Sequence, residues 1–252
     1  MTFLVPAEAY ERFMGRLSEP LAAEFADACG VGPGQRVLDV GCGPGALTAE
    51  LVRRLGPDAV TAIDPSPPFV DAAAARFPRV DVRTGGAEDL PFPDDHFDAA
   101  LAQLVVHFMT DPVAGLREMR RVTRPGGTVG ACVWDHGGGH GPLSLFWQAA
   151  RDLDPESPGE ADRAGTHEGQ LVALAEAAGL TDLEPGTVSV TVGFDDLDEW
   201  WVPFTLGVGP VGDYLRGLDD DRRAALREHC GELLPPAPFT VTGSAWSVAA
   251  RV

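Results

Sequence analysis

The sequence predicts an α/β fold in which helices cover both faces of a mostly parallel sheet. Short apolar runs alternate with segments that have helical patterns, and this alternation is typical of parallel sheets. The apolar runs are residues 36–41, 59–64, 80–84, 98–105 and 128–134. Ser66 and Asp111 each precede a proline, as at helix starts, and Gly56 and Gly179 stand where helices should end. The sequence therefore predicts repeated strand–helix–strand units.

The pattern changes after residue 135. A polar stretch at 152–165 is typical of a loop, and residues 171–178 then give one more helical face. Apolar and polar residues alternate at 188–192 and again at 246–252, which predicts a final pair of strands. We therefore expect seven strands, of which the last is antiparallel.

The segment 193–236, between these two strands, predicts a helical insertion. It contains a Trp200-Trp201 pair, glycine and proline breaks, and capping signals for a helix at about 220–231. We expect one domain over residues 1–252, in which 1–30 and 193–236 form a small lid at the end of the sheet.

Composition restricts the possible functions. The chain has 252 residues, 44% of them hydrophobic, and its 19 basic and 38 acidic residues give a formal charge of −19. Such a charge repels phosphate backbones and anionic membrane surfaces, so neither nucleic acid nor a membrane is an expected partner. Four cysteines without C-x-x-C spacing predict neither disulfides nor a thiolate zinc site. No signal-peptide pattern begins the sequence, so we expect a cytoplasmic protein, either a monomer or a homodimer.

A glycine loop gives the strongest local signal. Residues 37–45 (VLDVGCGPG) lead from a strand into a helix, so the backbone can approach a ligand and the helix can present free N–H groups. The pattern Gly41-x-Gly43-x-x-Ala46 also fits a dinucleotide site. Asp64 ends the second strand, where a carboxylate can bind the ribose of either NAD or S-adenosylmethionine.

Two features favour S-adenosylmethionine. Asp39 precedes the glycines and can hold an ammonium group, which NAD lacks, and the chain closes with paired strands rather than a sixth parallel strand. An NAD-dependent oxidoreductase is the less favoured alternative. A protein that binds S-adenosylmethionine but performs non-methylating chemistry also remains open.

Four stretches of the sequence resemble class I S-adenosylmethionine-dependent methyltransferases, in particular the small-molecule group of ubiquinone and menaquinone biosynthesis. They are VLDVGCGPGALT (37–48), AIDPS (62–66), GGAEDLPFPDDHFDAALAQLVVHFMTDP (85–112) and RPGGTV (124–129). The resemblance covers about half of the chain, residues 10–134. It implies a Rossmann-like fold, S-adenosylmethionine as methyl donor and S-adenosylhomocysteine as product.

The resemblance also implies contacts for each part of the donor. From the methionine end through the ribose to the adenine and the floor of the site, they are Asp39, Gly41, Cys42, Gly43, Asp64, Pro65, Ala87, Glu88, Gln103 and Leu104. The family usually has an acid before the Ala–Glu pair, which binds the adenine amino group, and this chain has Gly86 there. We expect Glu88 or a water to replace it.

Residues 10–16 (YERFMGR) resemble the first helix of the same group, in which an aromatic residue and an arginine lie over the donor. We therefore expect Tyr10 to contact the acceptor and Arg16 to bind the carboxylate of the donor by a charge-assisted bond. The alternative for Arg16 is a solvated position on the helix.

His107 follows the fourth strand and is the best-placed group for general base catalysis. Methyl transfer is an in-line displacement, so an enzyme contributes mainly alignment and the exclusion of water. A base is needed only if the acceptor arrives protonated. The alternative is a half-buried structural histidine.

Aromatic residues predict an acceptor site for a small apolar or aromatic molecule that is methylated on an O, N or activated C atom. Together with Tyr10, the expected contacts are Trp134, Trp200, Trp201 and Phe204. The alternative for the last three is a core of the lid itself. His136 and His140 have the spacing of a helical metal pair, but three glycines separate them and oppose a helix, so no metal is predicted.

Overall fold

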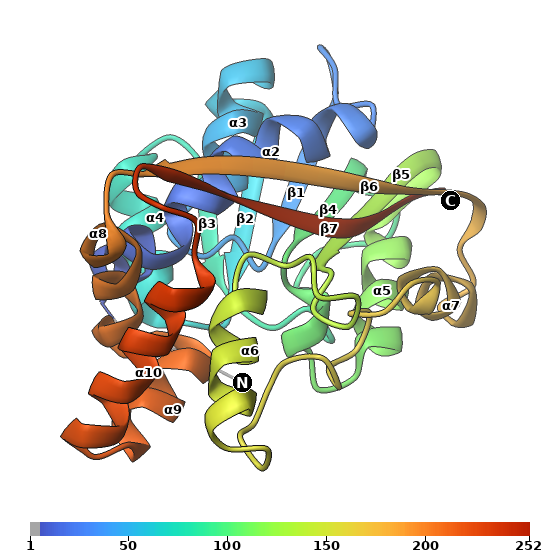
Figure 1. Cartoon of the computed structure of the whole chain (residues 1–252). Helices are drawn as coiled ribbons and strands as arrows, with labels where there is room; N and C mark the ends of the chain where they lie inside the picture. Colours follow the sequence, from blue (N-terminus) through green and yellow to red (C-terminus); the bar gives the residue numbers. More distant parts are fainter. Residues whose placement is uncertain (1–5) are drawn as a thin grey trace.

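Seven strands form one sheet in the computed structural model, which describes residues 6–252 (Figure 1). The strand order is β3-β2-β1-β4-β5-β7-β6, and the first five strands run parallel. These five are β1 (Val37–Val40), β2 (Val60–Asp64), β3 (Asp81–Thr84), β4 (Phe97–Gln103) and β5 (Thr123–Trp134). All five were expected from the apolar runs.

The last two strands pair antiparallel. β7 (Phe239–Arg251) lies between β5 and β6 (Thr181–Phe194) and is antiparallel to both, so the predicted antiparallel last strand is confirmed. Both strands begin well before the alternating runs that predict them. The first half of β6 contains Pro185 and a register shift, and most of its side chains are exposed, which leaves no alternation to detect there.

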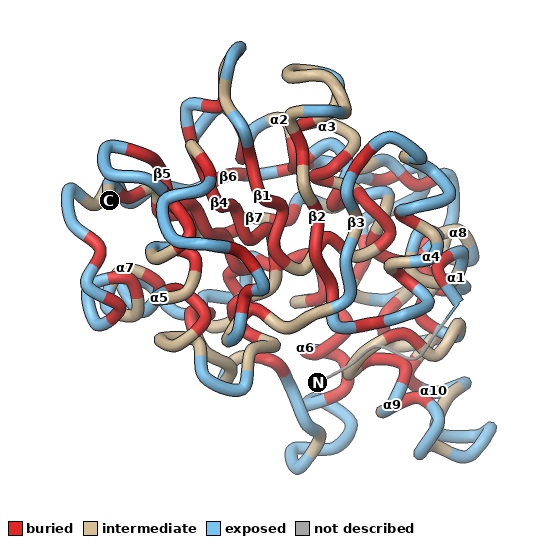
Figure 2. The backbone as a smooth tube through the Cα atoms, turned by 180° about the vertical axis from the view of Figure 1, so that it is seen from behind, coloured by how far each residue is buried: buried red, intermediate tan, exposed pale blue. Residues whose placement is uncertain are grey.

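Buried side chains cover both faces of the sheet. Val37 and Leu38 are both fully buried, yet they belong to different hydrophobic clusters because successive side chains of a strand point to opposite faces. One cluster includes residues of α2 (Arg16–Ala28), α3 (Ala46–Leu55) and α4 (Pro67–Arg76). The other includes residues of α5 (Pro112–Val122) and α7 (Gln170–Ala177). Figure 2 shows the central strands as buried, whereas the edge strand β3 is mostly exposed.

Short helices gather beyond one end of the sheet. The segment 193–236 contains α8 (Leu197–Trp201), a 3-10 turn (Val202–Leu206), α9 (Gly209–Gly217) and α10 (Asp220–Leu233). In Figure 1, α9 and α10 lie beside α6 (Ser144–Leu153), against which α10 packs. α10 confirms the helix predicted in this segment. The helices α9, in the same segment, and α6, before it, were not predicted from the sequence. The movement of these helices as a lid stays a prediction.

The N-terminal part of the predicted lid is helical. α1 (Ala7–Tyr10) continues through a π-helical turn (Glu11–Gly15) into α2. Residues 1–5 lie outside the described residues. They belong to the predicted lid and to the start of the sequence, in which no signal-peptide pattern was found. Two further 3-10 turns are formed by Pro57–Ala59 and Val106–Phe108. Within residues 6–252, no helix has both the length and the apolar character needed to cross a bilayer.

Candidate active site

The glycine loop (residues 41–45) joins β1 to α3 and needs glycine for two reasons. Gly41, Gly43 and Gly45 have φ values of 72°, 54° and 98°, which side chains rarely adopt. A Cβ atom at Gly41 would stand 2.5 Å from Val105, and one at Gly45 would stand 2.6 Å from Phe77. No atom lies within 4 Å of a Cβ placed on Gly43. Packing therefore requires two of these glycines, and the third borders open space that a ligand can enter.

Asp64 holds the glycine loop from the end of β2. One carboxylate oxygen accepts a hydrogen bond from the Gly43 N–H at 2.9 Å, and the other accepts from the Ser66 N–H at 2.8 Å. Burial raises the pKa of Asp64, and these two backbone bonds act in the opposite direction. Each carboxylate oxygen has a further lone pair, so Asp64 can also accept ribose hydroxyls. Pro65 is exposed between Asp64 and Ser66.

Asp39 ties β1 to α3 below the glycine loop. Its side chain is only 1% exposed and accepts a hydrogen bond from the Thr48 hydroxyl at 2.6 Å. Burial raises the pKa of Asp39 to about 7. A nearby ammonium group would restore its negative charge, because an opposite charge favours the ionised form. Cys42 is buried in the same loop, and burial raises the pKa of its thiol.

The predicted adenine site has a carboxylate beside Gly86. One oxygen of Glu88 accepts a hydrogen bond from the Thr110 N–H at 2.8 Å, close to the start of α5. A Cβ atom on Gly86 would stand 3.2 Å from the other Glu88 oxygen. Glu88 therefore lies next to the position of the missing acid, and its role in place of that acid stays a prediction. Ala87 is buried between the two residues.

The end of β4 presents one unpaired acceptor and one strained residue. The Gln103 amide donates to the Ser18 carbonyl at 2.9 Å, and its buried oxygen has no hydrogen-bond partner among the described residues. Leu104 has a φ of 62°, and its N–H donates to the Cys132 carbonyl at 2.9 Å. Non-glycine residues in this conformation cluster at functional sites.

A pocket lies beside these residues, and we call it the acceptor pocket. Four of the residues predicted for the site line it, and these are Tyr10, Leu104, His107 and Trp134. Phe13, Phe108, Glu160 and the start of α9 also line it, without a role predicted from sequence. They come from distant segments that only the fold brings together, and no local motif marks them.

His107 is buried in the wall of the acceptor pocket, with 6% of its surface exposed. Its Nδ1 atom has no hydrogen-bond partner within the described part of the chain. Burial, followed by His136 and Arg163, lowers the pKa of His107 well below its usual range. The ring is therefore neutral at physiological pH. A neutral imidazole can accept a proton, but this low pKa makes it a weak base.

The aromatic residues of α8 and the following 3-10 turn lie elsewhere. Trp200, Trp201 and Phe204 are at most 5% exposed and do not belong to the described lining of the acceptor pocket. Phe204 contacts both tryptophan rings, together with Phe13 and Phe146. This arrangement agrees with the alternative interpretation, in which Trp200, Trp201 and Phe204 form a core of the lid itself. Their predicted contact with an acceptor stays untested.

Arg16 links α2 to the end of β6 and to α8. It forms an ion pair with Glu199 at 2.9 Å, donates to the Gly193 carbonyl at 3.0 Å, and lies over the Phe194 ring. Arg16 is therefore not simply a solvated helix residue. Its predicted bond to the carboxylate of the donor stays a prediction.

His140, one of the two histidines after β5, has a structural role. The buried Asp135 carboxylate contacts His140 Nδ1 and accepts from the Gly138 N–H, both at 2.7 Å, and this fixes the glycine-rich turn. Within residues 6–252, no three His, Cys, Asp or Glu side chains are grouped as a metal site would require. All four cysteines are free and buried.

Comparison with known proteins agrees with this geometry. Residues 38–130, from β1 into β5, match the model of a methyltransferase domain family. An uncharacterized methyltransferase of Mycobacterium tuberculosis is 42% identical over 50% of this chain and 49% of its own length. The demethylmenaquinone methyltransferase of Mycolicibacterium paratuberculosis is 46% identical over 42% of this chain and 44% of its own length. The chain thus spans about half the length of these curated relatives.

Solved structures also resemble nearly the whole chain in fold. Phosphoethanolamine N-methyltransferase 2 of Haemonchus contortus was solved with phosphomonomethylethanolamine and S-adenosylhomocysteine. The likeness covers 97% of this chain and 56% of that chain, with a TM-score of 0.61 and 18% sequence identity. At this identity the likeness shows the fold alone.

Proposed function

We propose that this chain, whose residues 38–130 match the model of a methyltransferase domain, is an S-adenosylmethionine-dependent methyltransferase of class I that methylates a small apolar or aromatic molecule. The acceptor atom is an O, N or activated C atom. The acceptor pocket is the observation that carries the proposal. It is lined mainly by apolar and aromatic side chains with a few polar groups, as small-molecule sites are, and it includes Tyr10 and Leu104, which the resemblance to methyltransferases places at the donor.

The residues present fit the methyl donor. Gly43 borders open space, Asp64 has free lone pairs, and the buried Gln103 oxygen lacks a partner within the described chain. S-adenosylmethionine supplies an electrophilic methyl group on a sulfonium, and S-adenosylhomocysteine is the product. An NAD-dependent oxidoreductase receives no support from the family match over residues 38–130.

The chain contributes chiefly alignment and the exclusion of water. Aromatic and aliphatic side chains of the acceptor pocket can hold the nucleophile in line with the methyl group, and removing water favours this displacement. His107 is neutral and has an unpaired Nδ1, so it can accept a hydrogen bond or a proton from the acceptor. Its role as a general base stays a prediction. α8 to α10 would close over the pocket as a lid.

Transfer of an isotopically labelled methyl group tests the proposal. The purified protein is incubated with S-adenosylmethionine labelled at its methyl group and with a panel of aromatic alcohols, amines and enols. We expect mass spectrometry to find label in one acceptor class and S-adenosylhomocysteine in equal amount. Binding of the donor without transfer to any acceptor class would instead favour the non-methylating alternative.

A further inference from the structure

Glu160 is a buried acid in the wall of the acceptor pocket. It belongs to the loop between α6 and α7, which the sequence marks only as a polar stretch. The residue is 3% exposed and lines the pocket together with His107 and His136. A charged group is costly to bury unless it finds partners, so the contacts of its two oxygens are informative.

The two oxygens of Glu160 differ in their partners. Oε2 accepts from the indole N–H of Trp147 at 3.0 Å. Oε1 has an ion pair with Arg163 Nε at 3.9 Å, which is too long for a hydrogen bond. Among residues 6–252, the structure shows no hydrogen bond to Oε1, and the buried Arg163 Nε has no hydrogen-bond partner there. Glu160 thus has, in the wall of the acceptor pocket, an acceptor without a hydrogen-bond partner among the described residues.

The surroundings of this oxygen define the group that it can bind. Most of the pocket lining is aromatic or aliphatic, and burial lowers the pKa values of both His107 and His136, so both rings are neutral. Among the described residues of this lining, Glu160 is therefore the one acid, and a ligand must offer it a donor. Arg163 already places a positive charge next to the carboxylate. A neutral hydroxyl fits better there than a second cation.

We propose that Glu160 determines acceptor specificity and that the acceptor is an aromatic molecule whose hydroxyl group donates a hydrogen bond to Glu160 Oε1. The inference rests on the proposed function, because it treats the pocket as the acceptor site. A site built to bind a hydroxyl rejects an analogue that lacks it, since a buried polar group would otherwise stay unpaired.

Four matched ligands test this inference by calorimetry on protein saturated with S-adenosylhomocysteine. They are 2-naphthol, 2-methylnaphthalene, 2-acetylnaphthalene and the cation of 2-naphthylmethylamine. We expect the wild type to bind 2-naphthol at least about tenfold more tightly than 2-methylnaphthalene, as for a hydrogen bond to a charged group. We also expect it to bind 2-naphthol more tightly than the amine.

Glu160→Gln should change this preference without disturbing the fold. The glutamine carbonyl can still accept from Trp147, whereas its amide group, placed where Oε1 was, is a donor. The variant should therefore lose the preference for 2-naphthol and bind the ketone 2-acetylnaphthalene more tightly instead. Glu156→Gln is the matched control, since Glu156 is exposed on the same loop and should behave as the wild type.

Three results would overturn the inference: equal binding of 2-naphthol and 2-methylnaphthalene by the wild type, an unchanged preference in Glu160→Gln, or tighter binding of the amine. Titration with S-adenosylhomocysteine separates these from failure of the proposed function. If that product binds and the hydroxyl preference is missing, only the role of Glu160 is wrong. If the product does not bind, the proposed function fails. The binding of the four ligands is then measured by calorimetry on the protein without S-adenosylhomocysteine.

Discussion

Gly43 allows the predicted donor site to be tested at a single residue. Its φ is 54°, and open space surrounds the position of a Cβ atom. We expect Gly43→Ala to lower the affinity for S-adenosylhomocysteine at least about tenfold, because the methyl group fills space that the donor needs. The left-handed conformation should cost only about 1 kcal/mol of stability. Calorimetric titration and urea unfolding measure the two effects.

Gly34→Ala is the control for this substitution. Gly34 lies in the loop before β1, has a φ of 87°, and also has no atom within 4 Å of a Cβ placed on it. The control should show the same loss of stability with unchanged affinity. If Gly43→Ala kept full affinity, the glycine loop would not bind the donor.

His107 predicts a particular dependence of stability on pH. Burial lowers its pKa in the folded protein, so below pH 6.5 the unfolded chain binds a proton that the folded chain does not. The stability that comes from burying His107 as a neutral ring is therefore fully present above pH 6.5. It is lost as the pH falls below that value. The slope is about 1.4 kcal/mol per pH unit for one histidine.

His107→Gln removes this group while keeping a polar side chain. Urea unfolding between pH 5 and 7 should show a smaller acid-side loss of stability in the variant than in the wild type. Identical slopes in both proteins would mean that His107 is not buried as a neutral ring. A pH profile of turnover without an ionisation near neutrality would agree with a neutral, buried His107.

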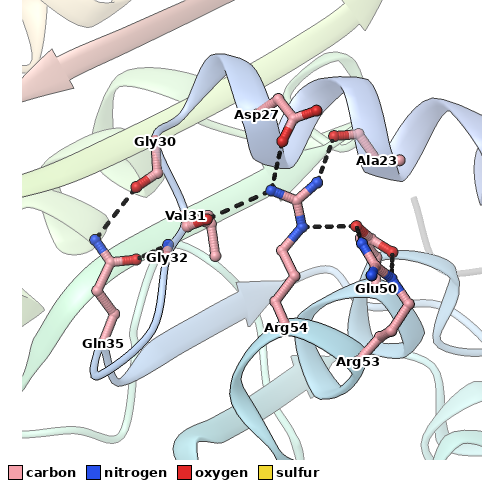
Figure 3. A network of polar contacts seen from close by, with 9 residues as sticks. All are labelled: Ala23, Asp27, Gly30, Val31, Gly32, Gln35, Glu50, Arg53 and Arg54. Carbon is pink, nitrogen blue, oxygen red and sulfur yellow. Dashed lines mark hydrogen bonds and ion pairs between the residues drawn. The ribbon is translucent and has the colours of Figure 1, made fainter.

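At the scale of elements, Arg54 fastens α3 to α2 and so supports the helix that follows the glycine loop (Figure 3). Its guanidinium binds the carboxylates of Asp27 and Glu50 and the carbonyls of Ala23 and Val31. The side chain is only 13% exposed. We expect Arg54→Met to lower the free energy of unfolding by about 2–3 kcal/mol, because it removes the hydrogen bonds that a largely buried guanidinium donates to two carboxylates and two carbonyls.

Arg53→Met tests whether burial causes this effect. Arg53 precedes Arg54 on the same helix and also binds Glu50, but its side chain is 68% exposed. Exposed ion pairs contribute little, so its loss should cost less than about 1 kcal/mol in the same urea experiment. Equal losses for both variants would contradict the role assigned to the Arg54 network.

Elements with strong patterns are the ones that sequence predicts. The buried strands β1, β2 and β4 are apolar runs, and the glycine loop has its own spacing, so these elements follow from local residues. α9 begins at Gly209-Pro210, which resembles a loop signal, although the segment becomes helical where Val211 and Leu215 are buried. Tertiary packing decides such an element, and local propensity does not.

At the scale of the whole molecule, the donor side of the site is built by neighbouring strand ends, whose positions follow from the strand pattern. The acceptor side combines segments that are far apart in the sequence. Asp39, Gly43 and Asp64 stand at the ends of neighbouring strands, so their proximity follows from the sheet. The acceptor pocket instead combines residues from α1, β5, α9 and the segment that follows β4 with Glu160 of a loop. No spacing in the sequence shows where such a loop folds, and therefore Glu160 emerges only from the structure.

The central claim is that the glycine loop and Asp64 bind S-adenosylmethionine for methyl transfer. Calorimetric titration of the protein with S-adenosylhomocysteine and, separately, with NADH tests this claim most directly. We expect micromolar binding of the sulfur compound, which at a hundredfold excess over its dissociation constant adds about 2.7 kcal/mol to the free energy of unfolding. NADH should not bind. Binding of NADH with no response to S-adenosylhomocysteine or S-adenosylmethionine would contradict the claim.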